Sequence, residues 1–305
     1  MFLHSGRKLA SHALILRRAM SATPNPAALA ANTFKGQVVF VTGGGSGINL
    51  AIATEFAKLG ASVGICGRTA ERLDTARSSI EAAAPDAQVI TRVADVRDYD
   101  ALAAALDATQ QEAGAPVSTL VAGAAGNFLC PAHKMSPNAF RTVVEIDLLG
   151  TFHACHAAFA QLRESKGSIV AVGAGQAFQP FHMQAHVGAA KAGVDNLMAN
   201  LALEWGPLGI RANTVCPGPI AGTEGMDRLG PPPGSEAYQK LLAAIPAGRY
   251  GQATEVAAAA TFLASPAASY ITGTVLRVDG GMALPGSGQF GATMAEFMKA
   301  AKSEK

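Results

Sequence analysis

Short runs of β-branched and apolar residues alternate, from about residue 37 onward, with longer stretches rich in alanine and leucine. The short runs have the length of buried strands, and the longer stretches have the period of helices. The pattern predicts seven strands, at residues 37–42, 62–66, 88–93, 119–122, 168–172, 211–215 and 275–278. Strands and helices in this alternation predict an α/β fold, a single Rossmann-type doubly wound parallel sheet with helices on both faces.

The alternation has no internal break, so residues 34–286 are predicted to form one domain. Within it, residues 217–234 are rich in glycine and proline and too long for an ordinary turn, which favours a mobile loop over the site. An N-terminal extension at residues 1–33 and a C-terminal tail at residues 287–305 flank the domain.

Basic residues without acidic neighbours mark the start of the chain, where Arg7, Lys8, Arg17 and Arg18 precede the first acidic residue at position 55. Such a composition can mark a mitochondrial presequence. The simpler interpretation is an over-long start with Met20 as the true first residue, because the alanine-rich, lysine-poor body is typical of a bacterial protein. We therefore expect a bacterial cytoplasmic location, with the mitochondrion as the alternative.

The composition narrows the class of protein. The 305 residues are 49% hydrophobic, which is enough for a sizeable core, and 15% are charged, with a formal net charge of +2. So small and balanced a charge argues against a nucleic-acid partner. No apolar run approaches the roughly 20 residues that span a bilayer, so no membrane span is predicted. The cysteines form no CxxC pair, which favours core positions in a reducing compartment and no metal site; they are Cys66, Cys130, Cys155 and Cys216.

A glycine-rich turn follows the first predicted strand, reading Thr42-Gly-Gly-Gly-Ser-Gly-Ile-Asn49, and a helical stretch begins at once. Glycines let the backbone approach a pyrophosphate closely, and a helix N-terminus offers it N–H groups and a positive dipole end. The turn therefore predicts a dinucleotide site. The residues expected to contact the cofactor here are Gly43, Gly45, Ser46, Gly47 and Ile48.

The end of the second predicted strand distinguishes the two nicotinamide cofactors. An acidic residue there binds the ribose 2′-hydroxyl of NADH, whereas an arginine accommodates the 2′-phosphate of NADPH. The chain has Arg68, so NADPH is the expected cofactor, and Arg72 one helical turn later is either a second phosphate ligand or a solvated surface residue. Asp95, at the end of the third strand, either caps a turn or accepts from the adenine amino group, and we favour the second role.

Further motifs accompany the turn, namely Asp95-Val96, a helix that carries Lys191, Pro217-Gly218 and Val278-Asp279-Gly280-Gly281. Together they resemble the short-chain dehydrogenase/reductase family over residues 34–281, which implies a nicotinamide-dependent oxidoreductase. Asn49 departs from the family pattern, because it stands where the third glycine of the turn is usual. We expect the helix to pack farther from its strand there, and cofactor affinity to suffer.

Most members of that family reduce ketones or oxidise alcohols with a serine, a tyrosine four residues before a lysine, and an asparagine on an earlier helix. Lys191 is present, but Ala174, Val187 and Asp147 occupy the serine, tyrosine and asparagine positions. No tyrosine occurs between residues 99 and 238, so none can be shifted into the site. Ordinary carbonyl reduction, in which the tyrosine exchanges a proton with the substrate oxygen, is therefore not expected.

Reduction of a conjugated acyl thioester escapes that requirement, because hydride adds to the far end of the conjugated system and a proton is then delivered to carbon. The intermediate dienolate needs hydrogen-bond donors for its oxygen and a positioned acid. The sequence resembles the 2,4-dienoyl-CoA reductases, in particular the peroxisomal type. The matching segments are 124–132 (AAGNFLCPA), 146–152 (IDLLGTF), 184–191 (QAHVGAAK), 204–206 (EWG) and 217–225 (PGPIAGTEG).

The resemblance implies roles for individual residues. Lys191 would bind the nicotinamide ribose hydroxyls and add positive charge to the site. Asp147 would act as acid/base or hold the proton-delivering water, and the nearby lysine, which opposes protonation of the carboxyl, favours the water-holding role. Asp147 is alternatively a polar residue that packs helices together. The positions that would line the nicotinamide side are Pro217, Gly218, Ile220 and Thr223.

The same resemblance implies a substrate site. Phe128, Ser136 and Asn138 match positions that contact the acyl thioester, and Arg97 and Arg228 match positions that meet the CoA part.

Simpler interpretations exist for several of these residues. The serine also fits the N-cap of a helix that starts at Pro137, and the two arginines also fit solvated surface positions. His186, with an ordinary pKa near 6.5, is a candidate acid but equally fits a helix start that faces solvent or a backbone carbonyl.

The leading hypothesis is an NADPH-dependent 2,4-dienoyl-CoA reductase of unsaturated fatty acid β-oxidation, with an acyl-CoA thioester as substrate. A second hypothesis keeps the cofactor but takes another acyl-CoA or a hydroxy or keto compound. A third is a non-catalytic NADPH-binding protein, which the absent serine and tyrosine motivate. Small residues on the helix predicted at 186–205 permit close helix approach, and related enzymes associate through this helix, so a homotetramer is expected.

Overall fold

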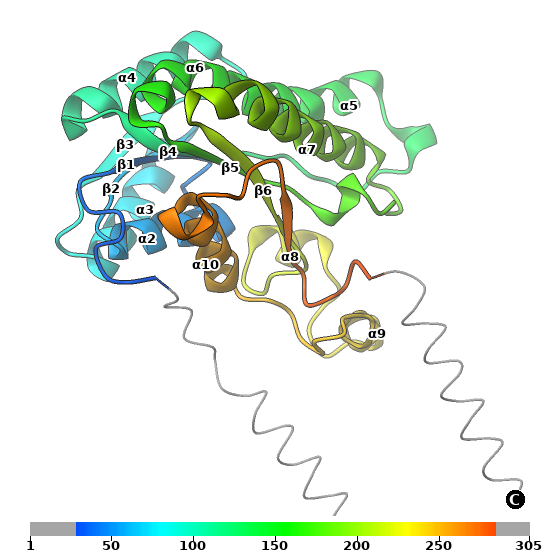
Figure 1. Cartoon of the computed structure of the whole chain (residues 1–305). Helices are drawn as coiled ribbons and strands as arrows, with labels where there is room; N and C mark the ends of the chain where they lie inside the picture. Colours follow the sequence, from blue (N-terminus) through cyan, green and yellow to red (C-terminus); the bar gives the residue numbers. More distant parts are fainter. Residues whose placement is uncertain (1–28, 285–305) are drawn as a thin grey trace, which may run out of the picture.

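A single parallel sheet organises the molecule (Figure 1). The structure, a computed structural model, describes residues 29–284 apart from the side chain of Leu229. The sheet has seven strands in the order β3-β2-β1-β4-β5-β6-β7, which confirms the predicted doubly wound fold. The strands are β1 (Val38–Thr42), β2 (Ser62–Gly67), β3 (Val89–Val93), β4 (Val117–Ala122), β5 (Ser168–Val172), β6 (Arg211–Pro217) and β7 (Val275–Val278).

Helices cover both faces of the sheet, and Figure 1 shows the two layers. One layer holds α2 (Gly47–Lys58), α3 (Ala70–Ala83) and α10 (Ala253–Ala264). The other holds α4 (Tyr99–Ala113), α5 (Pro137–Val144), α6 (Gly150–Ser165) and α7 (Ala185–Trp205). Two shorter helices, α8 (Glu224–Leu229) and α9 (Glu236–Ala244), lie between β6 and α10 in the chain.

The core consists of two apolar clusters, one on each side of the sheet. All five residues of β1 are buried, because successive side chains point to opposite faces and both faces are covered. Val39 and Val41 join the cluster beneath α2 and α10, whereas Val38 and Phe40 join the cluster beneath α4 and α6. Strand order reverses between β1 and β4, and ligands of such sheets bind in the crevice at this point.

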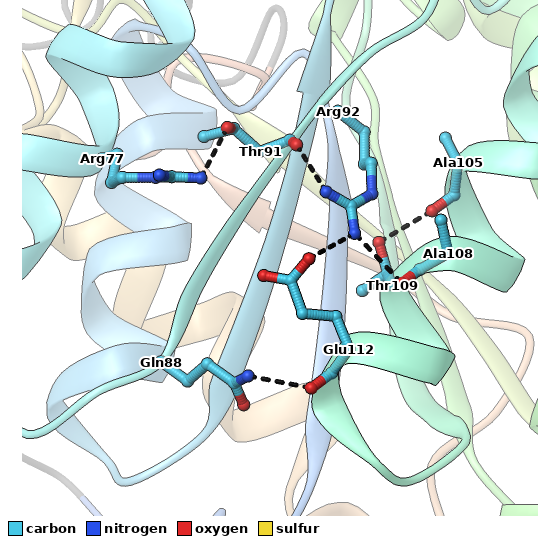
Figure 2. A network of polar contacts seen from close by, with 8 residues as sticks. All are labelled: Arg77, Gln88, Thr91, Arg92, Ala105, Ala108, Thr109 and Glu112. Carbon is cyan, nitrogen blue, oxygen red and sulfur yellow. Dashed lines mark hydrogen bonds and ion pairs between the residues drawn. The ribbon is translucent and has the colours of Figure 1, made fainter.

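The edge strand β3 is held from both faces by polar side chains (Figure 2). Arg92 donates to Glu112 Oε2 at 2.6 Å and to the carbonyl oxygen of Ala108 at 3.1 Å, both on α4. Arg77 of α3 donates to Thr91 Oγ1 at 2.8 Å. Because α3 and α4 lie on opposite faces, these bonds tie the strand to a helix on each face of the sheet.

Two local features differ from the simple pattern. The segment predicted as a mobile loop at 217–234 contains the helix α8, whose N-cap Thr223 accepts from the backbone N–H of Met226. Helices α5 and α6 are joined by a π-helical turn, Glu145–Leu149, and π-turns inside helices are frequent at functional sites. Asp147 lies in this turn.

The cysteine prediction is partly wrong. Cys66, Cys155 and Cys216 are buried, and burial raises the pKa of each thiol to about 12, so they are inert core residues. Cys130 is half-buried, because it lies on the surface segment after β4.

Within residues 29–284, no helix has the length and apolarity needed to cross a membrane, and no three His, Cys, Asp or Glu side chains form a metal-binding group. The tail predicted at 287–305 and most of the extension predicted at 1–33 lie outside the described residues. Both therefore stay predictions.

Candidate active site

A cleft of about 760 Å³ opens at the carboxyl ends of β1, β2, β3 and β4, and we call it the first cleft. Nine of the residues predicted to bind the cofactor line it: Gly43, Gly45, Ser46, Gly47, Ile48, Arg68, Arg72, Asp95 and Thr223.

The glycine turn has a backbone that side chains would disturb. Gly43 and Gly47 have φ of +68° and +57°, in the left-handed region that favours glycine. A Cβ on Gly44 would lie 2.7 Å from the side chain of Ile65, so the turn packs directly on β2. The Ser46 side chain makes no capping bond to α2. The first N–H groups of the helix are therefore available to an anion in the cleft.

Two arginines line the adenosine end predicted for this cleft. Arg68 is exposed and forms no ion pair with any described residue. Arg72 pairs with Glu224 of α8 at 2.9 Å, and both side chains are more than half exposed. The pair links α3 to α8 beside the cleft.

The carboxylate of Asp95 is hydrogen-bonded by Arg97, a neighbour on the same loop. It accepts from the backbone N–H and from the guanidinium of Arg97, at 2.6 Å for Nη2. The hydrogen bonds from Arg97 lower the pKa of Asp95 below its ordinary value. Arg97 lines neither cavity, so the predicted contact between Arg97 and CoA has no support in this arrangement.

A second cavity, of about 630 Å³, adjoins the first cleft, and Ile48, Gly126 and Asn127 line both. Its walls carry many apolar side chains, among them Leu129, Phe181 and Met226. The predicted site residues that line it are Ile48, Asp147, Lys191, Pro217, Gly218, Ile220 and Thr223. The junction between the cavities is therefore where a bound nicotinamide ring would meet a substrate.

Asp147 and Lys191 form a buried pair in the second cavity. The carboxyl Oδ2 lies 3.5 Å from Nζ of Lys191, and both side chains are almost fully buried. Oδ1 accepts from the backbone N–H of Gly126 at 2.7 Å, and Nζ donates to the carbonyl oxygen of Val172 at 2.8 Å. Burial raises the pKa of Asp147, although Lys191 and the Gly126 N–H act in the opposite direction. Oδ2 has no hydrogen-bond partner among the described residues, so it can hold a water molecule or a substrate group.

Comparison with known proteins decides the family. Residues 43–283 match the family described as enoyl-(acyl carrier protein) reductase, a group of short-chain dehydrogenases/reductases. The chain belongs to the short-chain dehydrogenase/reductase family. It is 45% identical over 251 residues to a peroxisomal 2,4-dienoyl-CoA reductase, (3E)-enoyl-CoA-producing, of Saccharomyces cerevisiae, covering 82% of this chain and 85% of that protein. It is 44% identical over 252 residues to the protein of the same description from Rattus norvegicus, with the same coverage.

The solved structure of levodione reductase superposes with a TM-score of 0.78 and 33% identity, covering 83% of this chain and all of that one. The predicted resemblance to the short-chain family and its 2,4-dienoyl-CoA reductases is thus confirmed. Ala174 and Val187, at the serine and tyrosine positions of the family, both line the second cavity. The wall that carries hydroxyl groups in most members of this short-chain family is therefore apolar here.

His186 is fully buried beneath Phe128, with ring centroids 4.2 Å apart. Because the ring is shielded from solvent, the solvent-facing alternative is wrong. Burial lowers the pKa of His186, which favours the neutral ring, whereas the backbone of Phe128 and the carboxyl of Asp147 act in the opposite direction. His186 lines neither cavity, whereas Phe128 lines the first cleft.

The other residues predicted to contact the substrate also differ in whether they line a cavity. Arg228 lines the first cleft, but Ser136 and Asn138 line neither cavity. Ser136 is the N-cap of α5 and accepts from the N–H of Ala139 at 3.1 Å, so its capping interpretation is confirmed. Sequence reasoning did not single out Asn127, which lines both cavities and whose buried Oδ1 has no partner in the described chain. Its place after β4, between Gly126 and Phe128, was the available signal.

Proposed function

We propose that the protein reduces 2,4-dienoyl-CoA thioesters with NADPH in the breakdown of unsaturated fatty acids. The observation that carries the proposal is the buried pair of Asp147 and Lys191 in a cavity where Ala174 and Val187 replace the usual hydroxyl groups. Such a cavity lacks the tyrosine proton donor for a carbonyl oxygen but retains a carboxyl for protonating carbon. The names of the yeast and rat relatives agree with this chemistry.

NADPH fits the first cleft. The glycine turn brings backbone N–H groups to the cleft, and Gly43 and Gly47 have a positive φ that residues with side chains rarely adopt. Arg68 offers the 2′-phosphate a guanidinium with no other ion-pair partner among residues 29–284. When bound, the cofactor supplies the hydride. Lys191 would hold its nicotinamide ribose, and Ile220 and Thr223 would border its ring.

Each turnover adds one hydride and one proton to the conjugated system. Hydride adds to C5 of the dienoyl group, electrons move toward the thioester oxygen, and a proton then adds to C2, which leaves the double bond between C3 and C4. Asp147 holds a water molecule at Oδ2, and this water gives a proton to C2. The carboxyl of Asp147 then gives its own proton to the water. The raised pKa of Asp147 favours the protonated form that this step needs. The positive charge of Lys191 stabilises the dienolate.

The remainder of the substrate finds matching surfaces. The apolar walls of the second cavity suit the acyl chain, and Phe128 lines the adjoining first cleft next to Asn127, which lines both cavities. Arg228, exposed beside the first cleft, suits a phosphate of CoA.

NADPH oxidation with 2,4-hexadienoyl-CoA, crotonyl-CoA and a simple ketone tests the function. The proposal expects rapid oxidation with the dienoyl thioester, little with the others, and a (3E)-enoyl product. Preference for crotonyl-CoA or for the ketone would favour another acyl-CoA or keto substrate. Tight NADPH binding without turnover of any thioester would favour the non-catalytic protein. A (2E) product would place the proton on C4 and overturn the role of Asp147 at C2.

We further propose a homotetramer. Leu149, Phe152 and Leu203, on the π-turn, α6 and α7, are 44%, 43% and 78% exposed, and such apolar surface is typical of subunit contacts. Light scattering tests the assembly, and a monomer at micromolar concentration would refute it.

We also propose a bacterial cytoplasmic location. Localisation of the tagged full-length protein tests it, and import into mitochondria would support the presequence alternative.

A further inference from the structure

Asn49 connects two backbone segments that lie far apart in the sequence. It is the third residue of α2 and lines the first cleft. Its Nδ2 donates to the carbonyl oxygen of Gly123 at 2.8 Å and lies 3.4 Å from the carbonyl oxygen of Gly43. The side chain therefore bridges the glycine turn and the segment that follows β4. Glycine, the usual residue at this position, has no side chain to make this bridge.

The same segment is held a second time by the end of β1. Thr42 Oγ1 accepts from the backbone N–H of Gly123 at 3.0 Å and of Ala124 at 3.2 Å. A Cβ on Gly123 would lie 2.2 Å from Oδ1 of Asn49, so the amide occupies the space beside Gly123. Gly123 is thus bound at its N–H by Thr42 and at its carbonyl oxygen by Asn49.

Three residues further along, the segment binds the proposed proton source. Gly126 donates its N–H to Oδ1 of Asp147 at 2.7 Å. The charged or titratable side chains that face Asp147 are Lys191 and His186, both on α7. Neither forms a hydrogen bond with Asn49, whose amide donates to Gly123 and Gly43. A change at Asn49 can therefore reach Asp147 through the position of Gly126.

We propose that Asn49 is a positioning residue for Asp147: its amide fixes the segment 123–126 so that the Gly126 N–H holds the carboxyl in the second cavity. This inference rests on the proposed function, since it gives Asp147 the role derived there. It also revises the expectation that Asn49 merely weakens cofactor binding. The residue adds a bond across the cleft that a glycine cannot supply.

Two substitutions separate the effect of the Asn49 hydrogen bond from the effect of the volume that its side chain fills. Asn49→Ala removes both the amide and its volume, whereas Asn49→Leu keeps a similar volume without the donor. We expect kcat to fall about fivefold in both, the equivalent of one hydrogen bond, with little change in NADPH affinity. Thr54→Ala is the matched control, because Thr54 also lies on α2 but its hydroxyl bonds within the helix, to Leu50 at 2.8 Å. It should behave like the wild type.

The pH dependence of kcat supplies a readout that a merely structural role would not move. Loss of the Gly126 hydrogen bond removes a contact that stabilises the ionised carboxyl. The limb of the profile that belongs to Asp147, identified by its loss in Asp147→Asn, should therefore move to higher pH in both Asn49 variants. An unmoved limb, or wild-type kcat in Asn49→Leu, would overturn the proposal and leave Asn49 as a space-filling residue.

Amide hydrogen exchange gives a test that needs no turnover. In the full-length protein, the N–H groups of Gly123, Ala124 and Gly126 should exchange several-fold faster in both Asn49 variants than in the wild type or Thr54→Ala. Unchanged exchange at these positions would overturn the inference. If the wild type does not reduce dienoyl-CoA, the proposed function fails, while the exchange result still decides whether Asn49 holds the segment.

Discussion

Asp147→Asn tests the proposed chemistry most directly. Asparagine has nearly the same shape, and its amide oxygen can still accept from the Gly126 N–H, which lies 2.7 Å from Oδ1. It cannot exchange a proton with a bound water. General acid–base catalysis contributes roughly 10²–10⁴-fold, so we expect kcat for 2,4-hexadienoyl-CoA to fall at least about 100-fold. The Kd for NADPH should change less than about threefold, because the substitution lies in the second cavity.

The same substitution has a cost in stability that follows from the geometry. At 3.5 Å, with an effective dielectric constant near 20, two opposite unit charges attract each other by about 5 kcal/mol. Desolvation of the pair offsets much of this, but removing one partner leaves the other charge buried. Lys191 keeps its bond to the Val172 carbonyl oxygen. At a pH above the raised pKa, where the carboxyl is ionised, we therefore expect a loss of about 3 kcal/mol in the free energy of unfolding, measured with urea, in a protein that still folds.

The pH dependence separates this account from simple loss of packing. Burial raises the folded-state pKa of Asp147 above its ordinary value of 3.8. Between the two values the folded chain binds more protons than the unfolded chain, so this residue's contribution to stability declines as pH rises through that window. Wild-type kcat should also fall as pH rises through the raised pKa. Asp147→Asn should lack both effects. A rate within threefold of the wild type, or the same pH limb in the variant, would refute the reasoning.

Three further substitutions probe the cofactor cleft. Arg68→Glu should weaken NADPH binding about 10- to 100-fold and NADH binding far less, in calorimetric titrations; equal losses would remove Arg68 as the phosphate ligand. Glu224→Gln frees Arg72 from its 2.9 Å ion pair, so NADPH should bind about threefold tighter with NADH unchanged, whereas weaker NADPH binding would contradict the competition. Gly123→Ala should destabilise the fold by about 1–3 kcal/mol, because its Cβ would lie 2.2 Å from Asn49, and Asn49→Ala in the same chain should restore most of that loss; additive losses would refute the contact.

Hydrophobic periodicity was sufficient for the sheet because its strands are buried on both faces. The first and last residues of each predicted strand lie within two positions of those observed. A run of buried residues such as Val38–Thr42 is readily recognised in the sequence. Helix starts with a capping residue, such as Ser136 before α5, were predictable for the same local reason. The helix α8 was not, because its six residues lie in a segment whose glycine and proline content resembles a loop.

Whether a site residue could be predicted depended on whether its position is fixed by neighbours in the sequence or by distant side chains. The glycine turn and Arg68 were predictable, because a strand end and the following turn fix their positions locally. The pairing of Arg97 with Asp95 and the burial of His186 under Phe128 depend on side-chain packing, which a motif does not encode. The bridge from Asn49 to Gly123 spans 74 residues and replaces a family glycine, so the sequence alone marked the position but not its contact.

The site retains the cofactor half of a short-chain reductase and changes the chemistry of the other half through a few side chains. Removing a tyrosine and a serine takes away the groups that protonate and bind a carbonyl oxygen, and the apolar Val187 and Ala174 close that route. The carboxyl at position 147 forms an ion pair with Lys191. The uncharged asparagine that is usual at this position in the family could not form one. Burial raises the pKa of the carboxyl, and Oδ2 has no hydrogen-bond partner among the described residues. In the reaction proposed above, this carboxyl supplies a proton to carbon through water, so loss of the phenol and gain of the carboxyl would belong to one change of reaction.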